Sequence, residues 1–136
     1  MGSKGRIDVL VVDDEAGILE PIRRLLSIEQ VEAATTTSPH EALELFDAHS
    51  PKVVISDLRM PDMNGWELLE EVRRRDPWAL RILLTGAGKR AEVIEAINRG
   101  ALFHFIEKPW DNARLLLVVR EALDRYDEQA RRRRLQ

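Results

Sequence analysis

The chain has 136 residues, of which 44% are hydrophobic and 33% are charged, and its formal net charge is −3. This is the composition of an ordinary globular domain with one buried core, and the slightly acidic balance argues against a nucleic-acid-binding surface spread over the domain. It contains no cysteine, which excludes disulfides and favours a reducing compartment, and no apolar stretch approaches the roughly 18–20 residues that cross a bilayer, so we expect a cytoplasmic domain without membrane attachment.

Five short apolar runs, each bounded by turn-forming residues, alternate with amphipathic stretches along the chain. This pattern predicts buried β-strands separated by single helices. The predicted strands are residues 7–12, 31–35, 53–56, 81–84 and 103–106.

The first two helical patterns differ in how clearly they begin. In the first, the apolar positions are Leu19, Ile22, Leu25 and Leu26. Pro21 interrupts this pattern and should kink the helix or cost it a hydrogen bond. The second begins with SPHE, residues 38–41, which supplies an N-cap serine, a proline at the first helical position and a capping-box glutamate.

The last three helical patterns have recognisable ends. Asn64 and Gly65 lead into the third, Gly100 should stop the fourth, and Asp111 can cap a long fifth helix. Their apolar residues are Leu68, Leu69 and Val72, then Val93, Ile94 and Ile97, then Leu115, Val119, Ala122 and Tyr126.

Strands that alternate with single helices imply an α/β fold, with a parallel sheet, right-handed crossovers and helices on both faces. Ligands of such sheets bind outside the carboxyl ends of the strands. The residues at these ends are Asp13, Asp14, Asp57, Thr85 and Lys108. Because the strands are parallel, these side chains should meet at one rim of the sheet.

The residue types at this rim predict a chemistry. Carboxylates without histidine or cysteine favour a hard cation, Mg²⁺ or Mn²⁺. Asp57, beside the cation, can act as a nucleophile on phosphorus and form an acyl phosphate. Lys108 would neutralise charge on the phosphoryl oxygens, and the Thr85 hydroxyl can donate to one of them.

Four segments at strand ends occur in a characteristic order. They are VVDDE (residues 11–15), ISDLRMPDMNGWELL (55–69), LLTG (83–86) and FIEKPW (105–110). These segments resemble the signature segments of the receiver domain of two-component response regulators, and the resemblance covers roughly residues 7–126. It implies a flavodoxin-like (βα)₅ doubly wound sandwich with strand order 2-1-3-4-5.

The resemblance also implies roles for individual residues at the rim. Asp57 would be the phosphoacceptor and a metal ligand. Asp14 would bind Mg²⁺ directly, Asp13 would support it through water, and the backbone carbonyl of Arg59 would complete the protein ligands.

Further positions match the part of the family pattern that senses phosphorylation. Thr85 matches the phosphoryl-sensing hydroxyl, and Phe105 falls at the switch aromatic position. Lys108 matches the lysine of the pattern, and the bond between Lys108 and Pro109 is implied to be cis.

By the same resemblance, the partners are a sensor histidine kinase, whose phosphohistidine donates the phosphoryl group, and an output domain or effector protein. Phosphorylation would switch the face made by the fourth helix, fifth strand and fifth helix, which could also form a phosphorylation-dependent homodimer. The domain would not be an enzyme beyond catalysing its own phosphorylation and dephosphorylation. Arg59 and Ala87 flank the path of a hydrolytic water and predict that dephosphorylation is slow. Neither the cognate kinase nor the output follows from the sequence.

Two other functions are compatible with an acidic rim. An aspartyl-nucleophile phosphatase typically carries a second acid two residues after its nucleophile, but that position is Arg59 here. A pseudo-receiver, a phosphorylation-independent interaction module, usually lacks an acid or the lysine, and none is missing. Both readings are disfavoured.

The ends of the chain fall outside the receiver pattern. We expect residues 1–6 to be a cloning remnant or a disordered terminus, 7–126 to be the receiver domain, and 127–136 to be a helical extension or the start of a linker. The basic run Arg131 to Arg134 could contact nucleic acid or anionic lipid, but a solvated helix end is the preferred interpretation. No direct nucleic-acid binding is expected. We expect the chain to be a receiver excised from a longer regulator, although a stand-alone receiver is an alternative.

Overall fold

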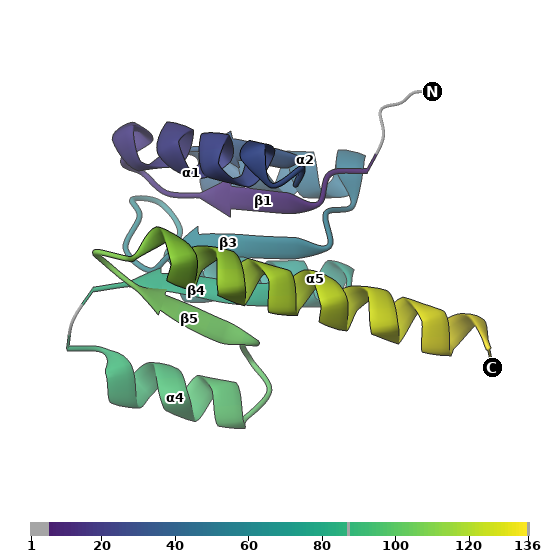
Figure 1. The fold of residues 1–136 in the computed structure, drawn as a ribbon. Helices are drawn as coiled ribbons and strands as arrows, with labels where there is room; N and C mark the ends of the chain where they lie inside the picture. The colour runs from purple at the N-terminus through teal and green to yellow at the C-terminus, as the bar shows by residue number, and fades with distance from the viewer. Residues whose placement is uncertain (1–5, 87, 136) are drawn as a thin grey trace.

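A computed structural model describes residues 6–86 and 88–135. Within these residues, five strands alternate with five helices (Figure 1). The elements are β1 (Val9–Val12), α1 (Ala16–Ile28), β2 (Ala33–Thr36), α2 (Pro39–His49), β3 (Val53–Asp57), α3 (Gly65–Arg75), β4 (Leu80–Thr85), α4 (Arg90–Asn98), β5 (His104–Glu107) and α5 (Asn112–Arg134).

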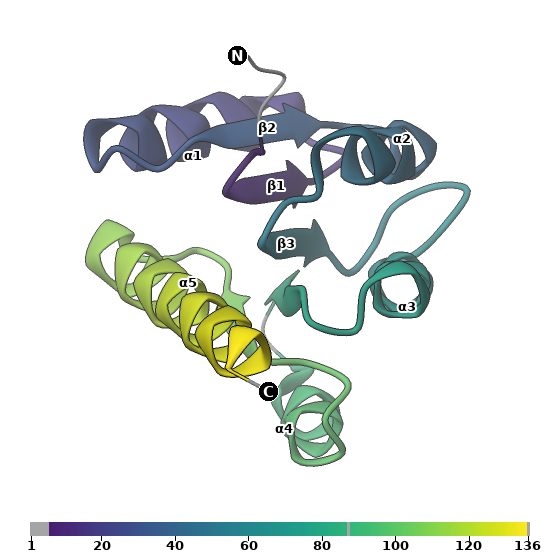
Figure 2. The same cartoon turned by 90° about the vertical axis from the view of Figure 1, so that its right-hand side faces the viewer.

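The five strands form one parallel sheet in the order β2-β1-β3-β4-β5. This confirms the flavodoxin-like (βα)₅ fold. Helices α1 and α5 cover one face of the sheet, and α2, α3 and α4 cover the other (Figure 2). In the register, Val12 pairs with Ser56, Asp57 with Leu84, and Thr85 with Glu107, so the carboxyl ends of the central strands lie along one rim.

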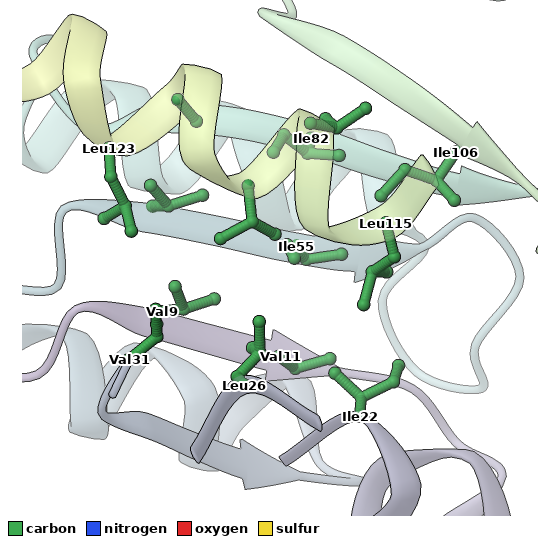
Figure 3. Close-up of a cluster of buried hydrophobic side chains, with 14 of the residues drawn as sticks. Val9, Val11, Ile22, Leu26, Val31, Ile55, Ile82, Ile106, Leu115 and Leu123 are labelled. Atoms are coloured by element: carbon green, nitrogen blue, oxygen red, sulfur yellow. The ribbon is translucent and has the colours of Figure 1, made fainter. Parts of the chain in front are cut away.

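Each face of the sheet carries its own hydrophobic core. Every residue of β1, β3 and β4 is buried, as expected for central parallel strands covered on both sides. One core packs alternate residues of these strands, such as Val11, Ile55 and Ile82, against α1 and α5 (Figure 3). The other packs the intervening residues, such as Val54 and Leu83, against α2, α3 and α4.

The strands differ from the predicted runs at their ends. β1 begins at Val9 rather than at residue 7, β2 covers 33–36 rather than 31–35, and β5 covers 104–107 rather than 103–106. Val31 explains the shift of β2, because its amide closes the end of α1 by donating to Leu26 O at 2.9 Å while its side chain is buried in the core. For Val31, hydrophobicity therefore marked a core residue correctly but not a strand residue.

The N-termini of α2 and α3 are capped in different ways. Ser38 caps α2 as predicted, and its hydroxyl accepts the amide of Glu41 at 3.1 Å. The predicted capping box is wrong, because the Glu41 carboxylate accepts from the Thr36 hydroxyl instead. The reciprocal box forms at α3, where Asn64 accepts from the Glu67 amide and the Glu67 carboxylate accepts from the Asn64 amide.

The predicted end of α4 and the predicted start of α5 are both confirmed. Gly100 follows the end of α4 with φ of +81°, a left-handed conformation that favours glycine, and Asp111 caps α5 by accepting the Ala113 amide at 2.8 Å. Helix α1 continues through Pro21, which is exposed. Ile94 does not join the core and is 42% exposed.

Within the described part of the chain, no helix is long and apolar enough to span a membrane.

Candidate functional site

Three carboxylates converge where β1 and β3 end. Asp13 directly follows β1, and Asp57 is the last residue of β3. Asp13 is fully buried, Asp57 is 8% exposed and Asp14 is exposed. Each carboxylate offers an oxygen that lies within 4.8 Å of the others. The parallel sheet thus brings together the three acids that the sequence placed at one rim.

Lys108 reaches this acidic group from the loop after β5. Its backbone amide donates to Thr85 O at 2.7 Å, and the bond to Pro109 is cis, as the family resemblance implied. The ammonium Nζ lies 2.9 Å from Asp13 Oδ2 and 3.0 Å from Asp57 Oδ1. The lysine therefore bridges the acids of two neighbouring strands.

The site favours the protonated form of both Lys108 and Asp57, for different reasons. Burial raises the pKa of Asp57 above its usual range, Lys108 pulls it down, and the nearby charges of Asp13 and Asp14 raise it again. Burial alone would lower the pKa of Lys108, but its pairing with Asp13 and Asp57 raises the pKa overall. The lysine is thus held protonated, while ionised Asp57 bears the cost of desolvation and like-charge repulsion.

The donor set fits a hard divalent cation. All three acids offer carboxylate oxygens, which Mg²⁺ prefers over nitrogen or sulfur. Asp13 Oδ2 is buried and receives no hydrogen bond of good geometry from the described residues, although the lysine ammonium is near. Asp13 Oδ1 accepts the Glu15 amide at 2.9 Å, which fixes the orientation of this carboxylate. The role expected of the Arg59 carbonyl stays a prediction.

Thr85 and Phe105 lie on one face of the sheet. Phe105 pairs in register with Leu83, two residues before Thr85, so the three side chains project to the same side. Thr85 is 1% exposed, and its hydroxyl donates to Gly86 O at 3.3 Å. Phe105 is half-buried, with the Arg90 guanidinium of α4 5.9 Å from the ring centroid. Ala87, to which the sequence assigned a role in dephosphorylation, lies outside the described residues.

Sequence reasoning missed the role of Gly65 in shaping this site. Gly65 begins α3, and its amide donates to Leu58 O at 2.8 Å. A Cβ at this position would overlap the backbone carbonyl oxygen of Asp57 and lie 3.0 Å from Leu58 Cα. The Asn-Gly pair signalled a helix start, but no local pattern signalled that the glycine touches the backbone beneath Asp57.

We expect the raised pKa of Asp57 to appear as a pH-dependent difference in stability between the unchanged chain and Asp57→Asn, measured without divalent cations. The folded chain holds the Asp57 proton more tightly than the unfolded chain, for which the usual pKa is 3.8. The resulting stabilisation is fully present below that value and is lost as pH rises through the raised pKa.

Thermal melts of both chains in EDTA from neutral to acidic pH would measure this difference. Asp57→Asn should have the higher Tm at neutral pH, and its advantage should shrink as the pH falls. A difference that does not change with pH would contradict the assignment of the shift to Asp57.

Comparison with known proteins gives the same family over most of the chain. The family described as response regulator receiver domain matches residues 9–120. The chain is 36% identical over 116 residues to the hydrogenase transcriptional regulatory protein HoxA of Cupriavidus necator, covering 85% of this chain and 24% of that protein. It is 32% identical over 128 residues to the DNA-binding transcriptional regulator NtrC of Escherichia coli, covering 94% of this chain and 27% of that protein. The chain thus spans about a quarter of the length of these regulators.

Solved structures agree with this match. A response regulator receiver domain protein from Clostridium thermocellum superposes with a TM-score of 0.82 at 34% identity, covering 90% of this chain and 98% of that one. The receiver domain of NtrX from Brucella abortus superposes with a TM-score of 0.80 at 33% identity, covering 86% and 98%. With the fold, the acidic pocket and these matches in agreement, the chain belongs to the response regulator receiver domain family.

Proposed function

We propose that this domain acts in the cytoplasm and accepts a phosphoryl group onto Asp57 from the phosphohistidine of a sensor histidine kinase. The observation that supports this most directly is the bridge from Lys108 Nζ to Asp57 Oδ1 at 3.0 Å and to Asp13 Oδ2 at 2.9 Å. This arrangement places a nucleophilic carboxylate, a fixed positive charge and a second acid in one pocket.

The transfer needs little covalent chemistry from the protein. An Asp57 oxygen forms the new bond to phosphorus while the bond from phosphorus to the imidazole nitrogen breaks, and that nitrogen keeps the electron pair of the broken bond as the imidazole leaves. Lys108 offsets negative charge on the phosphoryl oxygens as they approach. Positioning and charge stabilisation carry most of such reactions.

Asp13, Asp14, Asp57 and the backbone carbonyl of Arg59 would hold a divalent cation in this pocket. When bound, Mg²⁺ supplies positive charge against the phosphoryl oxygens. Without it, the three acids repel each other and the incoming phosphate, because Lys108 alone cannot neutralise them.

Phosphorylation is therefore expected to require a divalent cation. Incubating the chain with acetyl phosphate and Mg²⁺ should add the mass of one phosphoryl group to the intact protein, and the same incubation in EDTA should add none. Mn²⁺ should restore the reaction. A mass gain that persists in EDTA would contradict the proposed cation site.

Phosphorylation of Asp57 would change the conformation of the domain through movements of Thr85 and Phe105. A phosphoryl group on Asp57 offers charged acceptor oxygens, which bind a hydroxyl more strongly than the Gly86 carbonyl that Thr85 now contacts. Inward movement of Thr85 would open space for Phe105 on the same face of the sheet. Because Arg90 of α4 lies over the Phe105 ring and bonds Glu107 of β5 at 2.8 Å, the α4-β5-α5 face would rearrange.

We expect beryllofluoride, a mimic of the acyl phosphate, to produce NMR shifts that extend from the rim to Phe105, α4 and α5 when Mg²⁺ is present. Lys108→Ala should keep Mg²⁺-induced shifts at Asp13 and Asp14 but lose the distant ones. Shifts confined to the rim in the unchanged chain would contradict the switch. Sedimentation of the same samples would show whether that face forms a homodimer or instead serves an output domain or effector.

A further inference from the structure

A buried arginine of β4 lies at the end of the sheet opposite the acidic rim. Arg81 is the second residue of β4 and is 8% exposed. It pairs in register with Val54 and lies two residues before Leu83, so its side chain points to the face of the sheet that α2, α3 and α4 cover. The turn from α4 to β5 lies at this same end of the sheet (Figure 1). Arg81 is therefore placed to contact the C-terminal end of α4.

The Arg81 guanidinium donates to backbone oxygens of that turn. Its Nε donates to Ala101 O at 3.3 Å and its Nη2 to Gly100 O at 3.4 Å, while Nη1 donates to Ala79 O, just before β4, at 3.0 Å. The backbone carbonyl of Arg81 also accepts the Phe103 amide at 2.8 Å. One residue thus joins the start of β4, the end of α4 and the approach to β5.

The positive charge of Arg81 suits this position. The C-terminal end of a helix carries a partial negative charge. The last turn of α4 contains no basic residue, and the C-cap Arg99 is exposed, so the buried positive charge at this end comes from β4. Burial and the nearby charge of Arg73 lower the pKa of Arg81, and Glu70 and Asp76 partly offset this. Hydrogen bonds from a charged donor are stronger than neutral ones, so we expect them to hold the turn firmly.

The N-terminal end of α4, which lies toward the acidic rim, is held by weaker contacts. Its N-cap, Lys89, makes no capping hydrogen bond with its side chain. Arg90, the first residue of the helix, pairs with Glu107 at 2.8 Å, but its side chain is 63% exposed, and exposed ion pairs contribute little to stability. The two ends of α4 therefore differ in how much it costs to move them.

We propose that Arg81 is a positioning residue that keeps the C-terminal end of α4 in place while its N-terminal end moves on phosphorylation, an inference that rests on the switch proposed above. Val93 and Ala96, in the middle of α4, are fully buried, so a helix fixed at one end would tilt against the sheet rather than leave it. The phosphoryl transfer itself does not need Arg81, which lies at the opposite end of β4 from Thr85.

NMR of the unchanged chain can follow both ends of α4 when beryllofluoride is added with Mg²⁺. The Val93 amide bonds within the first turn of the helix, and the amides of Gly100 and Ala101 bond carbonyls near its end. Beryllofluoride should shift the Val93 signal strongly and leave the other two nearly unshifted. This measurement needs no variant, so it tests the fixed end however the variants fold.

Arg81→Met removes the guanidinium and keeps a long, flexible side chain that can fill the space. Before beryllofluoride is added, the Gly100 and Ala101 amides should exchange with solvent about tenfold faster, as expected when hydrogen bonds from a charged group are lost. Beryllofluoride should then shift these two amides as well as Val93. Acetyl phosphate should still add one phosphoryl group at the rate of the unchanged chain, which separates loss of positioning from general loss of the fold.

Val54→Ala is the matched control. Val54 is fully buried beside Arg81 in the register, and its truncation weakens the same core without removing a contact to the turn. In this variant, the Gly100 and Ala101 amides should stay unshifted by beryllofluoride. Arg81→Lys keeps the charge but carries its donors on one nitrogen, so it cannot span three carbonyls, and its exchange rates should lie between those of the unchanged chain and Arg81→Met.

The possible failures can be told apart. If beryllofluoride shifts Gly100 and Ala101 in the unchanged chain as much as Val93, the fixed end is overturned and the switch survives. If Arg81→Met responds as Val54→Ala does, the role of Arg81 is overturned. If beryllofluoride shifts the rim but not Val93, the switch is overturned, and the proposal with it. A chain that gains no phosphoryl group from acetyl phosphate would overturn the proposed function itself.

Discussion

The Asp57→Asn variant is expected to gain no phosphoryl group from acetyl phosphate under conditions in which the unchanged chain does. Asparagine has nearly the same shape, so the end of β3 and its pairing with Leu84 should persist. Its neutral amide is a poor nucleophile, and the substitution leaves two of the three carboxylates. Intact-protein mass spectrometry, with Mg²⁺ present throughout, would measure the difference.

Asp62→Asn is a matched control on the same loop between β3 and α3. Asp62 is exposed and has φ of +59°, a left-handed conformation that asparagine also tolerates. The substitution makes the same chemical change without altering the three-acid cluster, and phosphorylation should proceed as in the unchanged chain. Modification of Asp57→Asn, or loss of modification in the control, would show that the phosphoacceptor has been assigned to the wrong residue.

The rim could be predicted from the sequence because it depends on topology. Alternating strands and helices imply a parallel sheet, and a parallel sheet places residues such as Asp13, Asp57 and Thr85 at one edge whatever their rotamers. The bridge made by Lys108 could be expected only in outline, since it depends on the path of the loop after β5 and on side-chain angles. The same holds for the depth of burial that raises the pKa of Asp57.

Structural features that depend on contacts between distant segments could not be predicted from patterns in the sequence. Arg81 was the polar first residue of a predicted strand, and nothing nearby indicated that it would be buried, with its guanidinium donating to the backbone carbonyls of Ala79, Gly100 and Ala101. Glu41 had the spacing of a capping-box residue, yet the Thr36 hydroxyl, brought close by β2, bonded it instead. Local patterns predict local structure, and they fail where a tertiary contact offers a better partner.

Among the contacts between distant segments, the close approach of Gly65 to the backbone of Asp57 has the largest expected effect on the site. The chain turns back after β3 so that the first residue of α3 touches the backbone beneath Asp57, and the Gly65 amide bonds Leu58 O at 2.8 Å. An added Cβ would overlap the Asp57 carbonyl oxygen, which is backbone and cannot rotate away. Either α3 must shift or the end of β3, which carries Asp57, must deform.

Gly65→Ala is therefore expected to destabilise the domain by about 1–3 kcal/mol, as other overpacked sites do, and to lower its Tm by roughly 4–12 °C. Phosphorylation by acetyl phosphate should also slow, at a temperature where the variant is still folded. Gly17→Ala is the control, because Gly17 is an exposed residue of α1 with nothing within 4 Å of the added Cβ. Alanine should stabilise that helix by up to about 1 kcal/mol. Thermal melts of the two variants should thus move in opposite directions, and a Gly65→Ala chain that melts and reacts like the unchanged protein would show that α3 does not hold Asp57 in place.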